Sequence, residues 1–259
     1  MLPLWLALLA IVVGACGTII GAGGGFVLVP ILILLYPGQP PEAITAVSLT
    51  CVFFNAASGT VAYARAGRVD FRSGLLFAAA GLPGAVLGAW GTELIPAEVF
   101  NGVFGGLLCV MGLFLILSRH REPPAPPAGS GRLVPPHSRP LGAGISFGVG
   151  FLSSLFGIGG GIIHVPMMSR VLKFPTHVAT ATSHFILAIM TGAGAAVHLF
   201  RGELSGRAGE VLPLAAGMVI GAQLGAAVSR RVHGQWIVRG LALALLFVGT
   251  RILVMLWRS

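Results

Sequence analysis

Ten apolar runs follow one another along the chain, in two groups of five. The first group covers approximately residues 3–20, 25–36, 44–64, 73–91 and 99–118, and the second covers 141–157, 161–172, 177–199, 209–228 and 235–257. Most runs are long enough as helices to cross a hydrocarbon core of about 30 Å at about 1.5 Å per residue. The pattern therefore predicts an all-α polytopic membrane protein with two repeats of five hydrophobic segments.

A stretch rich in proline and arginine separates the two groups and has almost no apolar pattern. Such a composition is typical of an exposed linker. We therefore expect three parts: a first transmembrane repeat at residues 1–118, a linker at 119–140 and a second transmembrane repeat at 141–259.

A glycine cluster, in place of a polar turn, separates the first two runs of each group. The cluster Gly-Ala-Gly-Gly-Gly at residues 21–25 is followed by Pro30, and Gly-Ile-Gly-Gly-Gly at residues 157–161 is followed by Pro166. Glycine destabilises a helix because it keeps backbone freedom, so each cluster should break its apolar stretch. Irregular backbone inside a bilayer is tolerated only where protein buries it or where it lines a wet cavity. Paired breaks in corresponding halves therefore point to the binding site of a transporter.

The second run of each group is too short to cross the bilayer alone, because about 12 residues make a helix of about 18 Å. Either the glycine cluster is the tip of a re-entrant hairpin or the first two runs form one sharply broken element, and the pattern leaves both open. If the two runs make two crossings or a returning hairpin, each half crosses an odd number of times and the halves are inverted. Counting each broken pair as one crossing would instead place the basic loops of the second half outside.

The inverted arrangement places the basic loop residues on one side of the membrane. These are Arg65, Arg68, Arg72, Arg119, Arg121, Arg132, Arg139, Arg170, Lys173, Arg230 and Arg231. The other side receives Glu42, Glu93 and Glu98 and a loop of roughly balanced charge. Because short basic loops mark the cytoplasm, we expect a multi-pass protein of the inner (cytoplasmic) membrane with the linker cytoplasmic and both termini outside.

The two halves also align outside the glycine clusters. Residues 83–89 (PGAVLGA) match 220–226 (IGAQLGA), and residues 45–48 (TAVS) match 180–183 (TATS). Inverted repeats typically enclose a site near the midplane, where the halves meet. Glycine pairs at small-xxx-small spacing further predict close helix packing. These pairs are Gly84/Gly88, Gly102/Gly106 and Gly221/Gly225.

Composition supports the membrane class and excludes others. Hydrophobic residues make up 56% of the chain and charged residues 9%, against about 25% charged residues in an ordinary soluble domain. The net charge of +9 does not indicate a nucleic-acid partner, because basic cytoplasmic loops already explain it. The start of the chain has no basic residue, so the first run is expected to be a membrane segment and not a cleaved signal. We find no catalytic motif and no metal-ligand spacing, and expect neither enzymatic activity nor a cofactor.

The glycine clusters and the polar side chains beside them form the candidate binding site. A helix that resumes at Gly25 or Gly161 presents unpaired N–H groups and the positive end of its dipole, which suit an anion. Uncharged polar side chains could hold an oxyanion without trapping it. The alternatives are glycines that serve packing and hydroxyls that bond to their own helix. The candidate substrate-binding residues are Gly23, Gly24, Gly25, Ser48, Thr50, Asn55, Gly159, Gly160, Gly161, His164, Thr182, Ser183, His184 and Gln223.

Histidines are the candidates for proton coupling, because no Asp or Glu lies deep in a predicted span. His164 follows the second glycine cluster, and His184 lies inside its helix; either could protonate near neutral pH and couple a proton to an anion. A buried neutral histidine bonded to a carbonyl is the alternative for both. His177 and His198 lie near helix ends and are weaker candidates.

With these features together, the chain resembles the TauE/SafE family of bacterial membrane permeases. The resemblance covers both halves, and its most specific parts are residues 21–30 and 157–166. It implies an anion such as sulfite or an organosulfonate like sulfoacetate, a substrate path lined by the glycine clusters, and residues 45–48 and 180–183 beside that path. His164 stands where the first half has Leu28, so the two halves are not equivalent.

The preferred hypothesis is a secondary transporter for a small sulfur-containing anion, working by alternating access as one repeat rocks against the other. A carrier for another small anion, such as a carboxylate, is the first alternative. A non-transporting membrane scaffold whose glycines serve packing alone is the second. The sequence leaves open the direction of transport, a coupling ion such as H⁺, and a homo-oligomeric state.

Overall fold

The computed structural model describes residues 2–36, 38–117, 133–229 and 234–258, and every regular element in these ranges is helical. The first half contains α1 (Leu2–Ile20), α2 (Gly25–Leu35), α3 (Pro41–Arg65), α4 (Phe71–Gly91), the 3₁₀ turn η1 (Thr92–Leu94) and α5 (Ala97–Leu117). The second half contains α6 (Arg139–Phe156), α7 (Gly161–Pro166), the π-helical turn η2 (Met167–Val171), α8 (Thr176–Phe200), α9 (Ala208–Val228) and α10 (Gly234–Arg258). The predicted all-helical architecture is confirmed.

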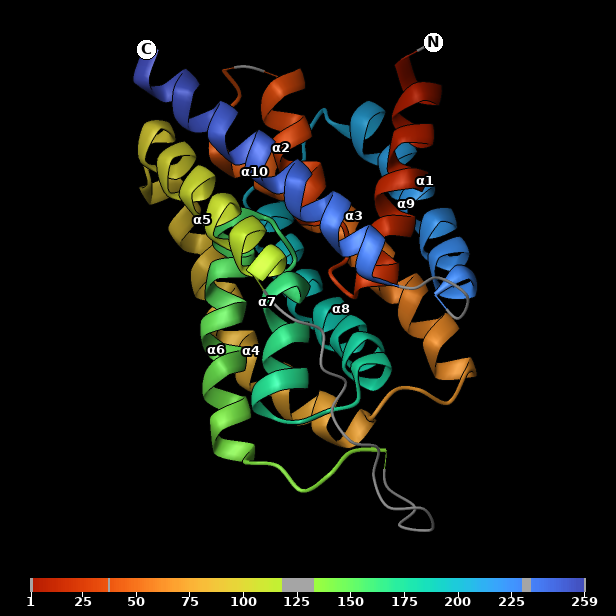
Figure 1. Cartoon of the computed structure of the whole chain (residues 1–259). Helices are drawn as coiled ribbons and strands as arrows, with labels where there is room; N and C mark the ends of the chain where they lie inside the picture. Colours follow the sequence, from red (N-terminus) through yellow and green to blue (C-terminus); the bar gives the residue numbers. More distant parts are fainter. Residues whose placement is uncertain (1, 37, 118–132, 230–233, 259) are drawn as a thin grey trace.

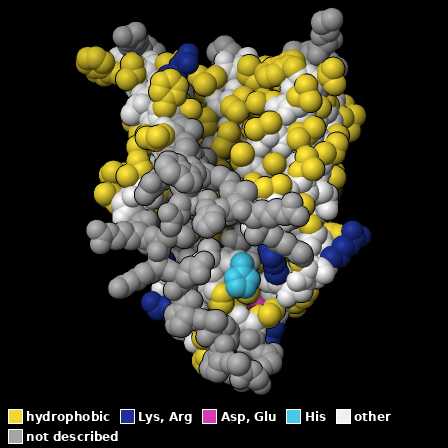
Figure 2. Space-filling view, turned by 45° about the vertical axis from the view of Figure 1, so that its right-hand side comes forward, with side chains coloured by type: hydrophobic (Ala, Val, Ile, Leu, Met, Phe, Trp, Pro, Cys, Tyr) yellow, Lys and Arg dark blue, Asp and Glu magenta, His cyan; other side chains and the backbone are white. Residues whose placement is uncertain are grey.

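The outer surface of the helices is apolar, as expected of a membrane protein. Within the described residues, five helices are long and apolar enough to cross a membrane: α3, α4, α5, α8 and α9. Large side chains such as Leu87, Leu113 and Leu224 are exposed, and hydrophobic side chains cover much of the face shown in Figure 2. A soluble monomer rarely exposes so much contiguous apolar surface, so this surface faces lipid.

Each half begins with a hairpin that ends near the middle of the molecule (Figure 1). Helix α1 runs inward from the end that carries both termini, and α2 returns to that end. Helix α6 starts at the opposite end, and α7 with η2 returns to it. The first two runs of each half therefore form a hairpin whose tip lies inside the molecule, and not one continuous broken helix.

Corresponding helices of the two halves pack in corresponding pairs. Helices α3 and α8 pack together, and α5 packs against α10. Helix α1 packs against α9, just as its counterpart α6 packs against α4. Each long span of one half therefore contacts the other half, and the two halves form one core.

Glycines allow the closest of these approaches, as small residues do between membrane helices. A Cβ atom on Gly221 would lie 2.4 Å from the Ile11 carbonyl oxygen, and one on Gly88 would lie 2.2 Å from the Phe151 carbonyl oxygen. The predicted close packing of Gly84/Gly88 and Gly221/Gly225 is confirmed. In the pair Gly102/Gly106 the prediction holds only for Gly102, whose Cβ would lie 3.2 Å from Leu256 of α10, whereas a Cβ on Gly106 would meet nothing within 4 Å.

The described residues of the charge prediction lie at the two expected ends of the molecule, although Arg201 and Arg207 also lie near the acidic residues. Arg65, Arg68, Arg72, Arg139 and Lys173 flank the starts or ends of helices at the end opposite the termini. Glu42, Glu93 and Glu98 lie at the end that carries the termini. The basic residues Arg119, Arg121, Arg132, Arg230 and Arg231, which belong to the same prediction, lie outside the described residues.

Candidate functional site

The two glycine breaks, residues 21–25 and 157–161, meet inside the molecule. All ten residues are buried. A Cβ atom on Gly25 would lie 2.7 Å from the Gly157 carbonyl oxygen, and one on Gly161 would lie 2.2 Å from the Gly21 carbonyl oxygen. Each break therefore uses a glycine to touch the backbone of the other, and packing is one reason for the glycines.

Backbone conformation is a second reason for the glycines at the two breaks. Gly24 and Gly160 have φ angles of 85° and 71°, in the left-handed region that favours glycine. Each precedes the first residue of the returning helix, so the chain reverses there. The N–H groups of Gly21, Ala22 and Gly23 all donate to the Gly17 carbonyl, which closes the end of α1.

The first amides of the two returning helices have no acceptor within the described part of the chain. They are the N–H groups of Gly24, Gly25 and Phe26 in the first half and of Gly160, Gly161 and Ile162 in the second. Buried backbone N–H groups without a partner are rare in native proteins. Two sets of such donors at the positive ends of two helix dipoles make an environment suited to an anion.

Two serines join each half to the glycine break of the other. Ser48 on α3 donates to the Gly157 carbonyl at 2.6 Å, and Ser183 on α8 donates to the Gly21 carbonyl at 3.2 Å. Both serines are fully buried. These two predicted residues therefore occupy equivalent positions on the two breaks, and in this conformation their hydroxyls bond to protein.

Val52 and Leu187 cover the middle of both breaks. A Cβ on Gly23 would lie 2.9 Å from methyl groups of both side chains, and a Cβ on Gly159 would lie 2.7 Å from Val52. Both side chains are buried. The breaks are therefore closed by direct contact in this conformation.

The other predicted polar residues are less close to the breaks. Thr50 donates to Ala46 of its own helix at 2.8 Å, and Thr182 accepts from the Asp70 amide at 3.0 Å. Gln223 is exposed and donates to Ser58 at 2.8 Å. It also lines a hollow of about 560 Å³, which contains Arg65 and Arg68, at the end opposite the termini.

Asn55 connects three helices. Its Nδ2 atom donates to the carbonyls of Gly14 on α1 and Met218 on α9, and its Oδ1 atom accepts from Thr18, each at 3.1 Å. The amide is thus fully engaged with protein. The geometry gives Asn55 a structural role in fixing α1, α3 and α9 beside the first break.

The two histidines predicted for coupling are buried, and each has one unpartnered ring nitrogen. His164 lies within 3.0 Å of the Ser146 hydroxyl through Nε2, and its Nδ1 atom has no partner. His184 lies 3.2 Å from the Thr180 carbonyl through Nδ1, and its Nε2 atom has no partner. A Cβ on Gly59 would lie 2.5 Å from the His184 ring, which is therefore tightly enclosed.

Ser153 and Ser154, which lie four and three residues before the second break, were not among the predicted site residues. Both are fully buried, and both hydroxyls lack a hydrogen-bond partner. Ser153 Oγ would lie 3.1 Å from a Cβ on Gly160. Two adjacent hydroxyls in an apolar run, aligned with Gly17 and Thr18 of the first half, were the signal that could have identified them.

Metal ligands do not gather anywhere in the described ranges: no three His, Cys, Asp or Glu side chains there could hold an ion together. The residues beside the breaks are amides, hydroxyls and imidazoles. This set of donors is suited to binding a small anion by hydrogen bonds.

Comparison with known proteins places this architecture in a family. The sequence model described as "Sulfite exporter TauE/SafE" matches residues 6–252. The probable membrane transporter protein YunE of Bacillus subtilis is 32% identical over 265 residues, which cover 96% of each chain. A probable membrane transporter protein of Xylella fastidiosa is 31% identical over 69% of this chain and 66% of its own, and MJ0441 of Methanocaldococcus jannaschii, also a probable membrane transporter protein, is 30% identical over 71% and 67%. No solved structure matches.

Proposed function

The chain belongs to the sulfite exporter TauE/SafE family, and on that premise we propose that it is a secondary transporter of a small sulfur-containing anion. The anion is sulfite or an organosulfonate such as sulfoacetate, and the membrane is the cytoplasmic membrane. The family's description names sulfite, and relatives that match most of this chain are named probable membrane transporter proteins.

The observation that carries this proposal is the pair of unpaired amide sets at residues 24–26 and 160–162. A sulfite ion or a sulfonate group has three oxygens that accept hydrogen bonds from several directions. The amides, with the Ser153 hydroxyl beside Gly160, offer donors and the positive ends of two helices without a fixed cation. Such a site binds an anion and still releases it.

Alternating access follows from the way the halves meet. The hairpins enter from opposite ends and touch at their tips, and matching helices pack in matching pairs. In our proposal the halves, residues 1–118 and 141–259, are inverted repeats that rock against each other. The bonds from Ser48 to Gly157 and from Ser183 to Gly21 close the breaks, and the rocking opens them to one side at a time.

The orientation in the membrane follows from charge. Basic residues gather at the end opposite the termini, and basic loops mark the cytoplasmic side. We therefore place the linker, residues 119–140, in the cytoplasm and both termini outside.

Counterflow of labelled anion in proteoliposomes tests the proposal. Wild-type protein should exchange sulfite or sulfoacetate, and Ser153→Ala should reduce the rate because it removes a donor at the second break. Thr50→Val is the matched control, since its hydroxyl bonds only to its own helix. Equal rates in Ser153→Ala and wild type would remove Ser153 from the site.

A substrate panel separates the alternatives. Exchange of carboxylates without exchange of sulfite or sulfonates would favour a carrier of another anion on the same scaffold. If no anion is exchanged and none raises the melting temperature, the glycines serve packing alone and the protein is a scaffold, because any ligand of the folded state stabilises it.

A further inference from the structure

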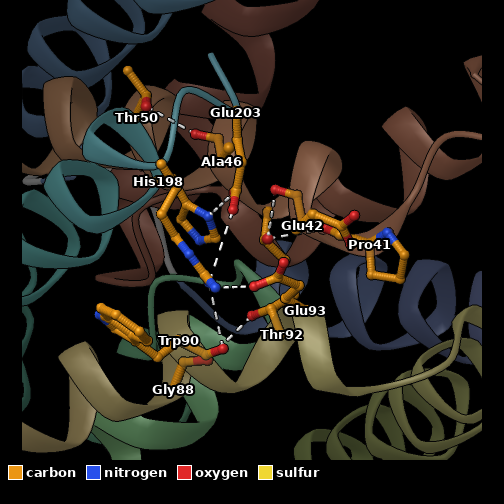
Figure 3. A network of polar contacts seen from close by, with 12 residues as sticks. Pro41, Glu42, Ala46, Thr50, Gly88, Trp90, Thr92, Glu93, His198 and Glu203 are labelled. Carbon is orange, nitrogen blue, oxygen red and sulfur yellow. Dashed lines mark hydrogen bonds and ion pairs between the residues drawn. The ribbon is translucent and has the colours of Figure 1, made fainter. Parts of the chain in front are cut away.

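A third buried histidine, His198, differs from the two beside the breaks because it has an acidic partner. It lies in the last turn of α8, at the end that carries the termini, and it is fully buried. Its Nδ1 atom is hydrogen-bonded to a carboxylate oxygen of Glu203 (Figure 3). Its Nε2 atom has no partner among the described residues.

Glu203 lies between this histidine and solvent. Its side chain is 14% exposed, whereas that of His198 is 0% exposed. Its amide donates to the His198 carbonyl at 3.1 Å, so the loop after α8 holds the carboxylate at the Nδ1 edge of the ring. A proton can therefore pass from solvent to the carboxylate and then to the imidazole.

The first half has no titratable histidine at the matching position. The alignment that pairs Ser48 with Ser183 pairs Tyr63 with His198. Tyr63 is buried, and its hydroxyl donates to the Thr18 carbonyl at 2.9 Å. The pairing of the glycine breaks matches Thr18 with Ser154, whose hydroxyl is buried and unpartnered. In the first half, Tyr63 and Thr18 are joined by a hydrogen bond. In the second half, the matching residues His198 and Ser154 each have a buried polar atom without a partner.

Charged groups around His198 link it to the second break. Glu203 lies 3.9 Å from Arg201, and Arg201 is paired with Glu93 after α4. Thr92, next to Glu93, donates to the carbonyl of Leu155 at 3.2 Å, and Leu155 lies two residues before the second break.

We propose that the His198–Glu203 pair is the site that binds the proton accompanying the anion. This inference rests on the proposed transport function. Protonation of His198 turns the neutral imidazole–carboxylate hydrogen bond into an ion pair beside the existing pair of Arg201 and Glu93. The change in charge is passed through Glu93 and Thr92 to Leu155 of α6. It thereby alters the contact between the two glycine breaks. His164 and His184 lack an acidic partner and a comparable path to solvent.

Transport driven by a pH gradient tests this role. Wild-type proteoliposomes should accumulate labelled anion when a proton gradient is imposed. His198→Tyr installs the residue of the first half and should retain counterflow within about twofold. It should lose gradient-driven accumulation by at least about tenfold, the scale of coupling between linked sites. Glu203→Gln should likewise retain counterflow and lose gradient-driven accumulation. If His198→Tyr does not fold, the Glu203→Gln result tests the inference on its own.

His177→Gln is the control, because His177 is exposed at the start of the same helix. It should keep both activities. Full gradient-driven accumulation in His198→Tyr or Glu203→Gln would overturn the inference.

A measurement without substrate separates this inference from the proposed function. If wild-type protein carries no anion, the transport proposal fails, but histidine NMR of the purified protein still tests the proton site. The imidazole signal that is missing in His198→Tyr should change with pH in wild type, and Glu203→Gln should displace that change. A signal that does not respond to pH would overturn the proton site.

Discussion

Single glycines at the breaks are held in place by the opposite half, and Gly161 shows this most clearly. A methyl group there would come within 2.6 Å of the Ala22 Cα atom, besides its closer contact with the Gly21 carbonyl. Backbone atoms cannot move aside as a flexible side chain can, so the two hairpin tips would have to separate.

We predict that Gly161→Ala lowers stability by about 1–3 kcal/mol, the usual cost of forcing extra volume into a packed interior. The measurement is thermal unfolding in detergent. Gly144→Ala is the matched control, since Gly144 is in α6 and a Cβ there meets nothing within 4 Å. That change should be neutral or stabilising by up to about 1 kcal/mol, because alanine favours a helix over glycine. Equal losses in both variants would contradict the close contact.

At this scale, sequence predicts residue types better than partners. The glycines, Ser48 and Ser183 could be identified because both halves carry them at matching positions. The role of Asn55 could not, since its partners on α1 and α9 become neighbours only when the halves pack. Ser153 was missed because the two adjacent hydroxyls of its apolar run do not by themselves show whether either one bonds to its own helix.

At the scale of elements, the hydrophobic pattern locates all ten apolar segments to within a few residues of the helices. The hydrophobic pattern does not predict the path that the short segments take through the molecule. The length of α2 shows that it cannot cross alone, but only the packing of the glycine break before it against residues 157–161 shows that α1 and α2 form a hairpin. The π-turn η2 after Pro166 leaves no clear signal in the apolar pattern.

The contact between hairpins predicts coupling between the serines that hold them. Ser48→Ala and Ser183→Ala each leave a buried carbonyl with one partner fewer, and each should cost about 1–3 kcal/mol. Because both bonds close the same contact, the double mutant should differ from the sum by about 0.5–3 kcal/mol in a thermal or denaturant unfolding cycle. Thr50→Val, two residues from Ser48, should change little. Additive costs would indicate that the two hairpins move independently.

At the scale of the whole molecule, the charge distribution predicts which end faces the cell interior. Ser138 and Ser205 are exposed at opposite ends, before α6 and after α8. In a variant without Cys16, Cys51 and Cys109, Ser205→Cys should react with a membrane-impermeant maleimide in intact cells. Ser138→Cys should react only after permeabilisation. The reverse pattern would invert the proposed topology.

The proposed transport requires an anion to bind between the two glycine breaks. The most direct test is a structure with selenite, the selenium analogue of sulfite, located by its anomalous scattering. We predict one selenium peak within hydrogen-bonding distance of the amides at residues 160–162 or 24–26, with the breaks moved apart. A saturating selenite concentration that leaves the breaks in contact and places selenium only in the arginine-lined hollow beside Gln223, or nowhere on the protein, would contradict it.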